Sequence, residues 1–273
     1  MKHWIVTVAL ACAFLTMVLH FARAGGAPVQ EAAGEVASGT SFTLSFPANV
    51  TQGDQVTIFA ACAGHSNTLS VSGLGAAVWT LLESNPAPTD TNSPAADMWQ
   101  ATAPASAGNI IAVAAASTDA CAAHAAEWAG TTAVKDGGMA NDRDSSWFGG
   151  LGNASTTNAS DLVVLDVAWK GNAMITGAPI GTTGPLRAYT AMAAVSVGTA
   201  LSVQPYYFLA WKTASYPAVN GSFSASGDWS ALQAALASSS PNPSPTAAAP
   251  CAGPTPPGGI MPYVCAQSGA SQW

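Results

Sequence analysis

The residues best suited to chemistry gather near the middle of the chain, in the stretch 120–130. Within eight positions it combines a thiol, an imidazole, a carboxylate and an indole: Cys121, His124, Glu127 and Trp128. With a second acid, Asp166 or Glu83, the Glu127 carboxylate would suit glycoside hydrolysis, which needs two carboxyl groups about 5–10 Å apart. The sequence does not place these acids together, and exposed acids at strand ends are the commoner case. The stretch therefore suggests a carbohydrate-active enzyme without completing its catalytic pair.

A nucleophilic hydrolase has weaker support. His65 and Ser66 are adjacent in AGHSN, but the chain has no Gly-x-Ser-x-Gly turn, and His124 is the only other histidine after residue 24. A catalytic triad would need these groups to meet in space. Zinc is not predicted, because no Cys-x-x-Cys pair is present. Enzymatic activity stays undecided on these residues, with a non-enzymatic role favoured.

An acid-rich segment, DGGMANDRD at 136–144, offers oxygen ligands of the kind that calcium prefers. The candidate ligands are Asp136, Asp142 and Asp144. Their spacing differs from that of an EF-hand loop and Arg143 lies among them, so a solvated polar loop is the alternative reading. Calcium is the one cofactor that the sequence suggests.

Aromatic residues supply the candidate binding platform. Trp147 and Phe148 lie in SSWFGG, and Tyr206 and Tyr207 could extend the same surface. Aromatic side chains on a glycine-flanked loop can stack on sugar rings or anchor a partner protein. The alternative is that these rings fold back and cap the core, since aromatic side chains are usually buried.

The first 24 residues are typical of a secretory signal peptide. Lys2 precedes an apolar run at 4–19, and the small-x-small triplet 22–24 (ARA) is a cleavage site. The apolar run is about 16 residues, shorter than the roughly 20 that a spanning helix needs, although an uncleaved anchor is the alternative. The protein is expected to be secreted or held at the cell surface, with no membrane span after cleavage.

Charge is scarce and mostly negative. After residue 24 the chain keeps five basic residues against fourteen acids, a net charge of −9, and charged residues make up 8% of the whole sequence. This balance argues against nucleic acid and anionic membranes as partners. A glycan or a cell-surface protein is the expected partner, and the oligomeric state is not predicted.

Four cysteines follow the signal peptide, an even number that suggests two disulfides in an exported protein. Three pairings are open. The favoured one joins Cys62 to Cys121, which lie in core-type runs, and Cys251 to Cys265, which lie in the tail. The first bridge would close a loop of about 60 residues and contribute about 4 kcal/mol through chain entropy.

Short apolar runs separated by turn residues recur from residue 41 to 237, without a βαβ alternation. They predict a single antiparallel β-sandwich, jelly-roll-like, with about 11–12 strands. Residues 25–40 are small and polar and are expected to form a flexible lead-in, and 131–160 to be the longest irregular segment. Eight of the eighteen prolines fall between 241 and 262, so 238–273 is predicted to be an extended Pro/Ser-rich tail.

The stretch 109–130 fits two structures. Its alanine content and the polar residues before it favour a short helix over 120–129. A strand would put Cys121, Ala123, Ala125 and Glu127 on one face, with His124 and Trp128 on the other. The strand is preferred, partly because of the resemblance that follows.

The order of VTQGDQVTIFAA, VSGLGAAVWTLLE, EWAG and TTNASDLVVLDVAW resembles a recurrent β-sandwich domain of secreted and surface bacterial proteins, usually without an assigned activity. The resemblance covers about residues 41–237. In it, the EWAG of 127–130 stands where a Glu-Tyr-Ser-Gly-like strand is expected, and DLVV at 161–164 opens a later strand. It implies architecture rather than activity, and it carries no catalytic residues over to this chain.

A non-enzymatic binding or adhesion module, carbohydrate-binding in its favoured form, is therefore the first expectation. The alternatives are a structural subunit of an extracellular assembly, with the Pro-rich tail reaching a neighbour, and a carbohydrate-active enzyme using Glu127 and Asp166.

Overall fold

Extended backbone makes up every regular element in the described part of the chain, as its alternating and β-branched runs predict. The computed structural model describes residues 27–85, 92–148, 154–156, 161–176, 180–181, 189–210, 215–216 and 219–238. Side chains are described in these ranges except at 133–148, 154–155, 180–181, 215–216, 219–220 and 238. All these residues belong to the first of two units into which the chain divides, 1–241 and 242–273. The predicted signal peptide and residues 239–273 lie outside the description.

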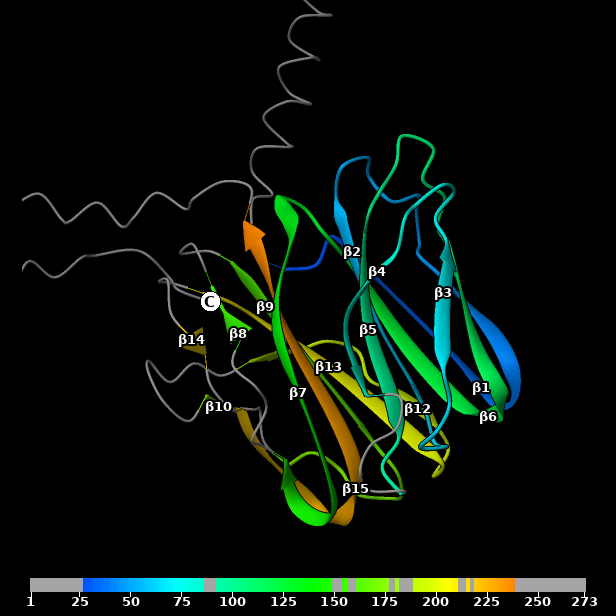
Figure 1. Cartoon of the computed structure of the whole chain (residues 1–273), viewed down its shortest axis with the longest axis vertical. Coiled ribbons are helices and arrows are strands. Elements are labelled where there is room, and N and C mark those ends of the chain that lie inside the picture. Colours follow the sequence, from blue (N-terminus) through cyan, green and yellow to red (C-terminus); the bar gives the residue numbers. More distant parts are fainter. Residues whose placement is uncertain are drawn as a thin grey trace, which may run out of the picture. The chain divides into compact units, whose positions relative to one another are not determined.

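The strands that precede Gly130 form the first sheet (Figure 1). Among the described residues this sheet has six strands, all antiparallel to their neighbours. In spatial order they are β1 (Gln30–Ser45), β6 (Ile110–Trp128), β2 (Gln55–Cys62), β5 (Ala95–Thr102) and β4 (Thr80–Asn85), with β3 (Leu69–Gly73) pairing β6 at one end.

The second sheet is built from the strands that follow a two-residue turn at 129–130, where Gly130 adopts a φ of 70° that favours glycine. Its described order is β10 (Ile180–Gly181), β15 (Val219–Ser238), β9 (Leu162–Trp169), β13 (Leu201–Leu209) and β11 (Thr190–Ala191). β7 (Thr131–Phe148) also pairs β15, and β12 (Val195–Val197) also pairs β13. The short strands β8 (Ala154–Ser155) and β14 (Ser215–Tyr216) pair with each other.

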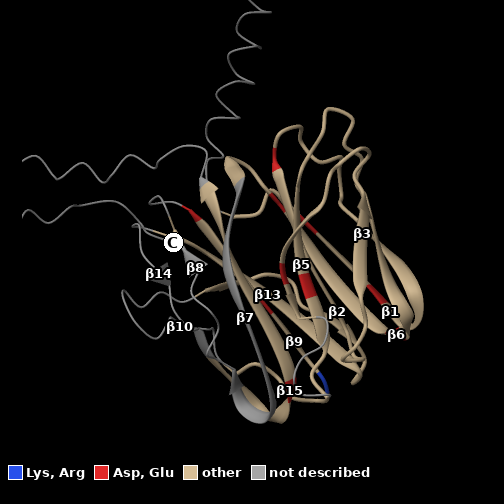
Figure 2. Cartoon of the chain, viewed as in Figure 1, with Lys and Arg blue, Asp and Glu red and all other residues tan. Residues whose placement is uncertain are grey.

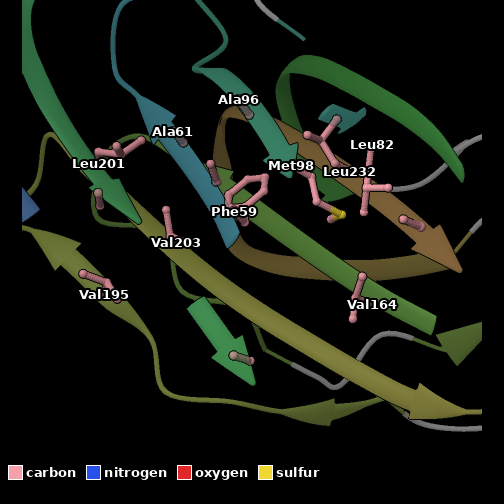
Figure 3. Packing of buried hydrophobic residues seen from close by; sticks show 14 of the residues in the cluster. Phe59, Ala61, Leu82, Ala96, Met98, Val164, Val195, Leu201, Val203 and Leu232 are labelled. Carbon is pink, nitrogen blue, oxygen red and sulfur yellow. The ribbon is translucent and has the colours of Figure 1, made fainter. Parts of the chain in front are cut away.

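The sheets pack as an antiparallel β-sandwich, which confirms the predicted fold class. Their inner faces share one apolar core, drawn from β2, β5 and β6 on one side and β9, β13 and β15 on the other (Figure 3). Strand alternation fills this core: the even-numbered apolar residues of β9 point inward, whereas Val163, Leu165 and Val167 lie on the outer face. Both faces of β9 are buried, as its apolar sequence, interrupted only by Asp166, predicts.

The first sheet folds over its own outer face. β6 pairs β2 through 121–128 but β3 through 111–115, and β1 follows it with register shifts between Val36 and Ser41. These bulges bend both strands, so that the second half of β1 returns over the first half. A Cβ at Gly34 would lie 2.6 Å from the carbonyl oxygen of Thr43, which explains why this position holds glycine.

A second core fills the space under this fold-over. Leu44, Ile111 and Val113 come from the returned halves, and Val56, Ile58 and Trp99 come from the outer face of β2 and β5. The outer face of the second sheet carries a third cluster, in which the rings of Trp169, Tyr206, Phe208 and Trp229 pack with Ala173 and Tyr189. Apolar clusters therefore cover the outer face of each sheet as well as the space between the sheets, which fits a sequence with few long polar side chains.

Two segments predicted to be irregular are strands, so those expectations were wrong. Residues 30–40, expected in a flexible lead-in, belong to β1 and pair β6, and 131–148 form β7 against β15. Their small and polar composition disfavours a strand locally, but cross-strand pairing with a long partner outweighs that preference. Residues 120–128 are strand rather than helix and 129 begins the following turn, which confirms the preferred strand and its two faces.

Candidate functional site

Glu127, the leading catalytic candidate, is fully buried and holds the loop that follows β1. Its Oε1 accepts a hydrogen bond from the Thr51 amide at 2.8 Å, and its Oε2 accepts one from Gln30 Nε2 at 2.6 Å. The Gln30 side chain also forms two hydrogen bonds of 3.1 Å with the backbone of Ala48: its Nε2 donates to the carbonyl, and its Oε1 accepts from the amide. These contacts describe a carboxylate that positions a loop, because its oxygens are directed at structural donors rather than at a cavity.

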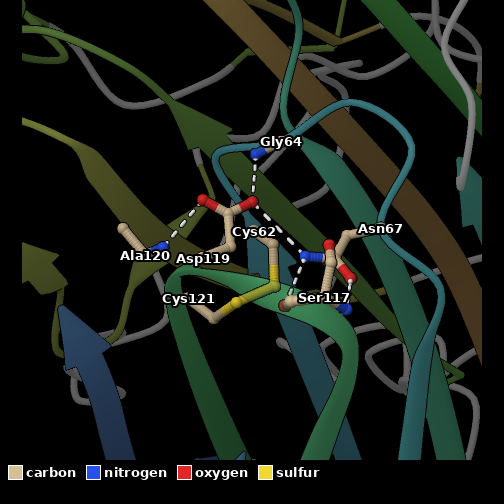
Figure 4. Close-up of a disulfide and its surroundings, with 7 residues drawn as sticks. All are labelled: Cys62, Gly64, Asn67, Ser117, Asp119, Ala120 and Cys121. Atoms are coloured by element: carbon tan, nitrogen blue, oxygen red, sulfur yellow. Dashed lines mark hydrogen bonds between the residues drawn. A yellow bond between two sulfur atoms is a disulfide. The ribbon is translucent and has the colours of Figure 1, made fainter. Parts of the chain in front are cut away.

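Two more acids of the first sheet bind backbone amides in the same way. Asp97 is buried on β5, where it accepts bonds from the Ser84 hydroxyl and the Leu69 amide, and burial raises its pKa despite these bonds. Asp119 accepts bonds from the amides of Gly64 and Ala120 and from the side chain of Asn67 (Figure 4). Asp97 therefore ties β5 to β3 and β4, and Asp119 holds the turn that follows β2.

The predicted bridge between Cys62 and Cys121 is present and lies beside Asp119 (Figure 4). The two cysteines face each other directly in the β2–β6 register, with 4.1 Å between their Cα atoms. Both are buried in the core under the fold-over. Cys251 and Cys265 lie outside the described residues, so their pairing stays a prediction.

Of the two proposed catalytic pairs, Glu127 with Asp166 is not assembled, and Glu83, the other candidate partner, lies on β4 opposite Met98. Glu127 lies on the outer face of the first sheet with Cys121 and Ala125, whereas Asp166 shares the inner face of β9 with Val164 and Ala168. The first sheet therefore stands between the two carboxyl groups. Asp166 is buried, and burial raises the pKa of its carboxyl group well above the usual value.

His124 is also engaged structurally, at the edge where the sheets meet. Its Nε2 lies 3.0 Å from Glu31 Oε2 on β1, and the same oxygen accepts a 3.2 Å bond from the Ala193 amide in the second sheet. Hydrogen bonding to His124 is the main cause that lowers the pKa of Glu31. The neighbouring Trp128 packs edge-on against Tyr207 at 5.3 Å between ring centroids, so rings from both sheets close this edge.

His65 and Ser66 lie in the turn after β2, with His65 half-buried and Ser66 exposed. His124 is bonded to Glu31 instead of to this turn, and the described residues contain no hydrogen bond between His65 and Ser66. The arrangement gives no support to a serine nucleophile.

A pocket of about 540 Å³ opens on the outer face of the second sheet. Its volume falls in the range of roughly 300–1,000 Å³ that small-molecule sites occupy. The floor consists of three aromatic residues, Trp169 on β9, Tyr189 beside β11 and Tyr206 on β13, which are 7%, 4% and 3% exposed. Met174, which is 68% exposed, and Ala194 stand at its rim.

Hydrogen bonds hold the floor of this pocket in place. Trp169 Nε1 donates to the Ala173 carbonyl at 2.6 Å, and Gln233 Nε2 donates to the Tyr189 hydroxyl at 3.0 Å. Tyr189 also packs edge-on against Phe208, with 4.7 Å between ring centroids. Rings fixed in this way form a preorganised surface, which reduces the entropy lost when a ligand binds.

Of the four predicted binding residues, Tyr206 lines this pocket and Tyr207 does not. Adjacent residues of a strand point to opposite faces, so Tyr207 enters the inner core beside Trp128. Trp147 and Phe148 lie at the end of strand β7, opposite Ser222 and Gly221, and not on the expected loop. Their side chains lie outside the description, so their role in binding stays a prediction.

The acid-rich segment likewise forms part of strand β7, where Asp136 and Asp142 face Ala235 and Trp229 in the register. The expectation of a loop there was wrong, because pairing with the long strand β15 outweighs the local preference of this polar sequence. The side chains of Asp136, Asp142 and Asp144 are not described, and calcium binding stays a prediction. Among the described side chains, no group of three or more His, Cys, Asp or Glu residues comes together as a metal site.

Sequence reasoning missed Trp169, Tyr189 and Gln204 as pocket residues. A signal for two of them was present: in a strand, Gln204 must share a face with Tyr206, and Trp169 ends a strand that is apolar on both faces. Tyr189 carried no such signal, because it reaches the pocket from a connection outside the long strands.

Charge is as sparse in three dimensions as in the sequence (Figure 2). The described side chains include ten acids and one basic group, Lys170, and the described residues that line the pocket carry no charge. The described part of the chain contains no helix with the length and apolarity needed to cross a membrane.

No protein-family model, curated protein or solved structure matches the chain.

Proposed function

We propose that this chain is an exported, non-enzymatic binding module that attaches to carbohydrate at a cell surface or in extracellular material. The observation that carries the proposal is the pocket on the outer face of the second sheet, with its floor formed by Trp169, Tyr189 and Tyr206. Aromatic walls with a few convergent polar groups are the usual composition of a ligand site, and rings of this kind pack well against sugars.

Three further observations support the same function. The first 24 residues are typical of an export signal, and the sequence resembles a sandwich domain of secreted and surface bacterial proteins. Glu127 binds the backbone amide of Thr51 and lies on the other side of the first sheet from Asp166, an arrangement that favours a binding role over catalysis by these two acids. Trp147 and Phe148 remain a second predicted contact with the ligand or with a partner protein.

Filling the pocket from its rim tests this function without removing a core contact. Ala194 is exposed and lines the pocket, so we expect Ala194→Trp to abolish retention on a panel of immobilised neutral and acidic polysaccharides. Ala114→Trp, at an exposed position of β6 in the first sheet, is the matched control and should bind as the wild type does. Absence of any retained polysaccharide, or retention that survives Ala194→Trp, contradicts the proposal.

A further inference from the structure

Two polar side chains of β13 give the pocket a defined hydrogen-bonding pattern, and this pattern deepens the function proposed above, on which it rests. Gln204 and Tyr206 are two positions apart on one strand, so both face the outer side of the second sheet. Both line the pocket. Any ligand seated on the aromatic floor meets them together.

The amide of Gln204 is locked in one orientation. Its Nε2 donates to the Met192 carbonyl at 2.7 Å and to the Pro205 carbonyl at 3.1 Å. Both partners are acceptors, so the nitrogen must stand on their side and the amide cannot be flipped. Its Oε1 receives no hydrogen bond from the described residues. Because Gln204 lines the pocket, this oxygen is available there to accept a hydrogen bond from a ligand.

Tyr206 supplies the complementary donor. The residue is 97% buried, and burial raises its pKa to about 12, so the hydroxyl keeps its proton. No described residue forms a hydrogen bond with this hydroxyl. Because Tyr206 lines the pocket, this hydroxyl is available to a ligand that accepts its hydrogen bond.

The charge of the surroundings restricts the ligand further. The described residues that line the pocket carry no charge, and after residue 24 the chain has fourteen acids against five basic residues. A uronate or sulfated chain would meet net repulsion and no cationic partner in this lining. A neutral ligand with adjacent donor and acceptor oxygens meets neither obstacle.

We propose that the pocket binds an uncharged sugar, with one sugar hydroxyl donating to Gln204 Oε1 and a neighbouring sugar oxygen accepting from the Tyr206 hydroxyl. The ring of the sugar lies against the aromatic floor of Trp169 and Tyr189. Gln204 and Tyr206 are then the residues that determine specificity, because they select adjacent hydroxyl groups over anionic or fully apolar ligands.

The test compares neutral and acidic oligosaccharides by isothermal titration calorimetry. The neutral probes are cellohexaose, xylohexaose and mannohexaose, and the acidic probes are oligomers of galacturonate and of mannuronate. We expect affinity for at least one neutral probe and none for the acidic ones. Tyr206→Phe and Gln204→Leu should each weaken that affinity roughly three- to tenfold, the effect of one lost hydrogen bond.

Tyr207→Phe is the matched control, because this tyrosine is adjacent on β13 but faces the inner core, and it should leave the affinity unchanged. Wild-type affinity in both Tyr206→Phe and Gln204→Leu, or binding of acidic probes as tight as that of neutral ones, overturns the assignment of the ligand. If that happens while Ala194→Trp still blocks binding, the ligand class fails but the proposed function stands. If no probe or polysaccharide binds at all, the proposed function fails with it.

Discussion

Asp166 places a carboxyl group on the inner face of β9, opposite Pro205 and Leu232 in the neighbouring strands. Burial raises its pKa well above the usual value of 3.8. The folded state therefore keeps this proton at pH values where the unfolded chain has lost it. Since stability falls with pH wherever the folded state binds more protons, Asp166 destabilises the fold increasingly as the pH rises above 3.8.

We predict that Asp166→Asn stabilises the protein at neutral pH, because the amide is close in shape to the neutral acid and never ionises. The expected gain is on the order of 1–3 kcal/mol at pH 7 and close to zero near pH 3. Urea unfolding monitored by tryptophan fluorescence at both pH values measures it. A gain of the same size at both pH values would show that the effect is not ionisation of Asp166.

The other buried acids show why residue type does not identify a catalytic carboxylate. Glu127, Asp97 and Asp119 each accept a hydrogen bond from the backbone amide of a distant residue. The sequence suggested catalysis only for Glu127, and its partner atoms show a carboxylate that holds a loop. Tyr206 shows the reverse case, where the structure leaves a predicted residue facing a pocket.

At the scale of elements, the bend in β1 and β6 is what gives the first sheet its second core. The bend brings Gly34 against the backbone of Thr43. A Cβ placed at Gly34 would also lie 3.2 Å from Leu44 Cγ and 3.3 Å from Phe42 Cδ2. Backbone cannot move aside as easily as the end of a flexible side chain. The fold-over therefore depends on this glycine.

We predict that Gly34→Ala destabilises the protein by about 1–3 kcal/mol, the usual cost of overpacking. Gly108→Ala is the matched control, because a Cβ at Gly108 would meet no heavy atom within 4 Å. Its effect should stay within about 0.5 kcal/mol. Thermal and urea unfolding of the two variants measure the difference, and equal stabilities would mean that β1 does not fold back as described.

At the scale of the whole sandwich, Glu31 links the sheets at one edge. It pairs with His124 of the first sheet and accepts a bond from Ala193 of the second, and these bonds lower its pKa below the usual 4.5. For a carboxyl group with a lowered pKa, the stabilisation is present above the unfolded value and disappears as the pH falls through the folded value. The link therefore weakens below about pH 4.5.

We predict that Glu31→Gln lowers stability at pH 7 and that its difference from the wild type shrinks as the pH falls below 4.5. Glu35→Gln, at an exposed position of the same strand, serves as the control and should change stability little. Unfolding free energies between pH 3 and pH 7 test this. A deficit in Glu31→Gln that does not depend on pH would show that its charge is not what joins the sheets.

The sequence by itself determined the all-β class of the fold, through short alternating apolar runs that neighbouring residues reveal. It favoured, without deciding, the strand that ends at Trp128 and the bridge from Cys62 to Cys121, because a short helix and two other cysteine pairings were also open. The strands β1 and β7, the fold-over and the pocket depended on the tertiary structure. The small and polar composition of residues 30–39 and 131–148 does not favour a strand locally. These residues form strands because they pair with β6 and β15. The pocket needed the same kind of information, because Trp169, Tyr189 and Tyr206 lie far apart in the chain and meet only where the outer face of the second sheet brings them together.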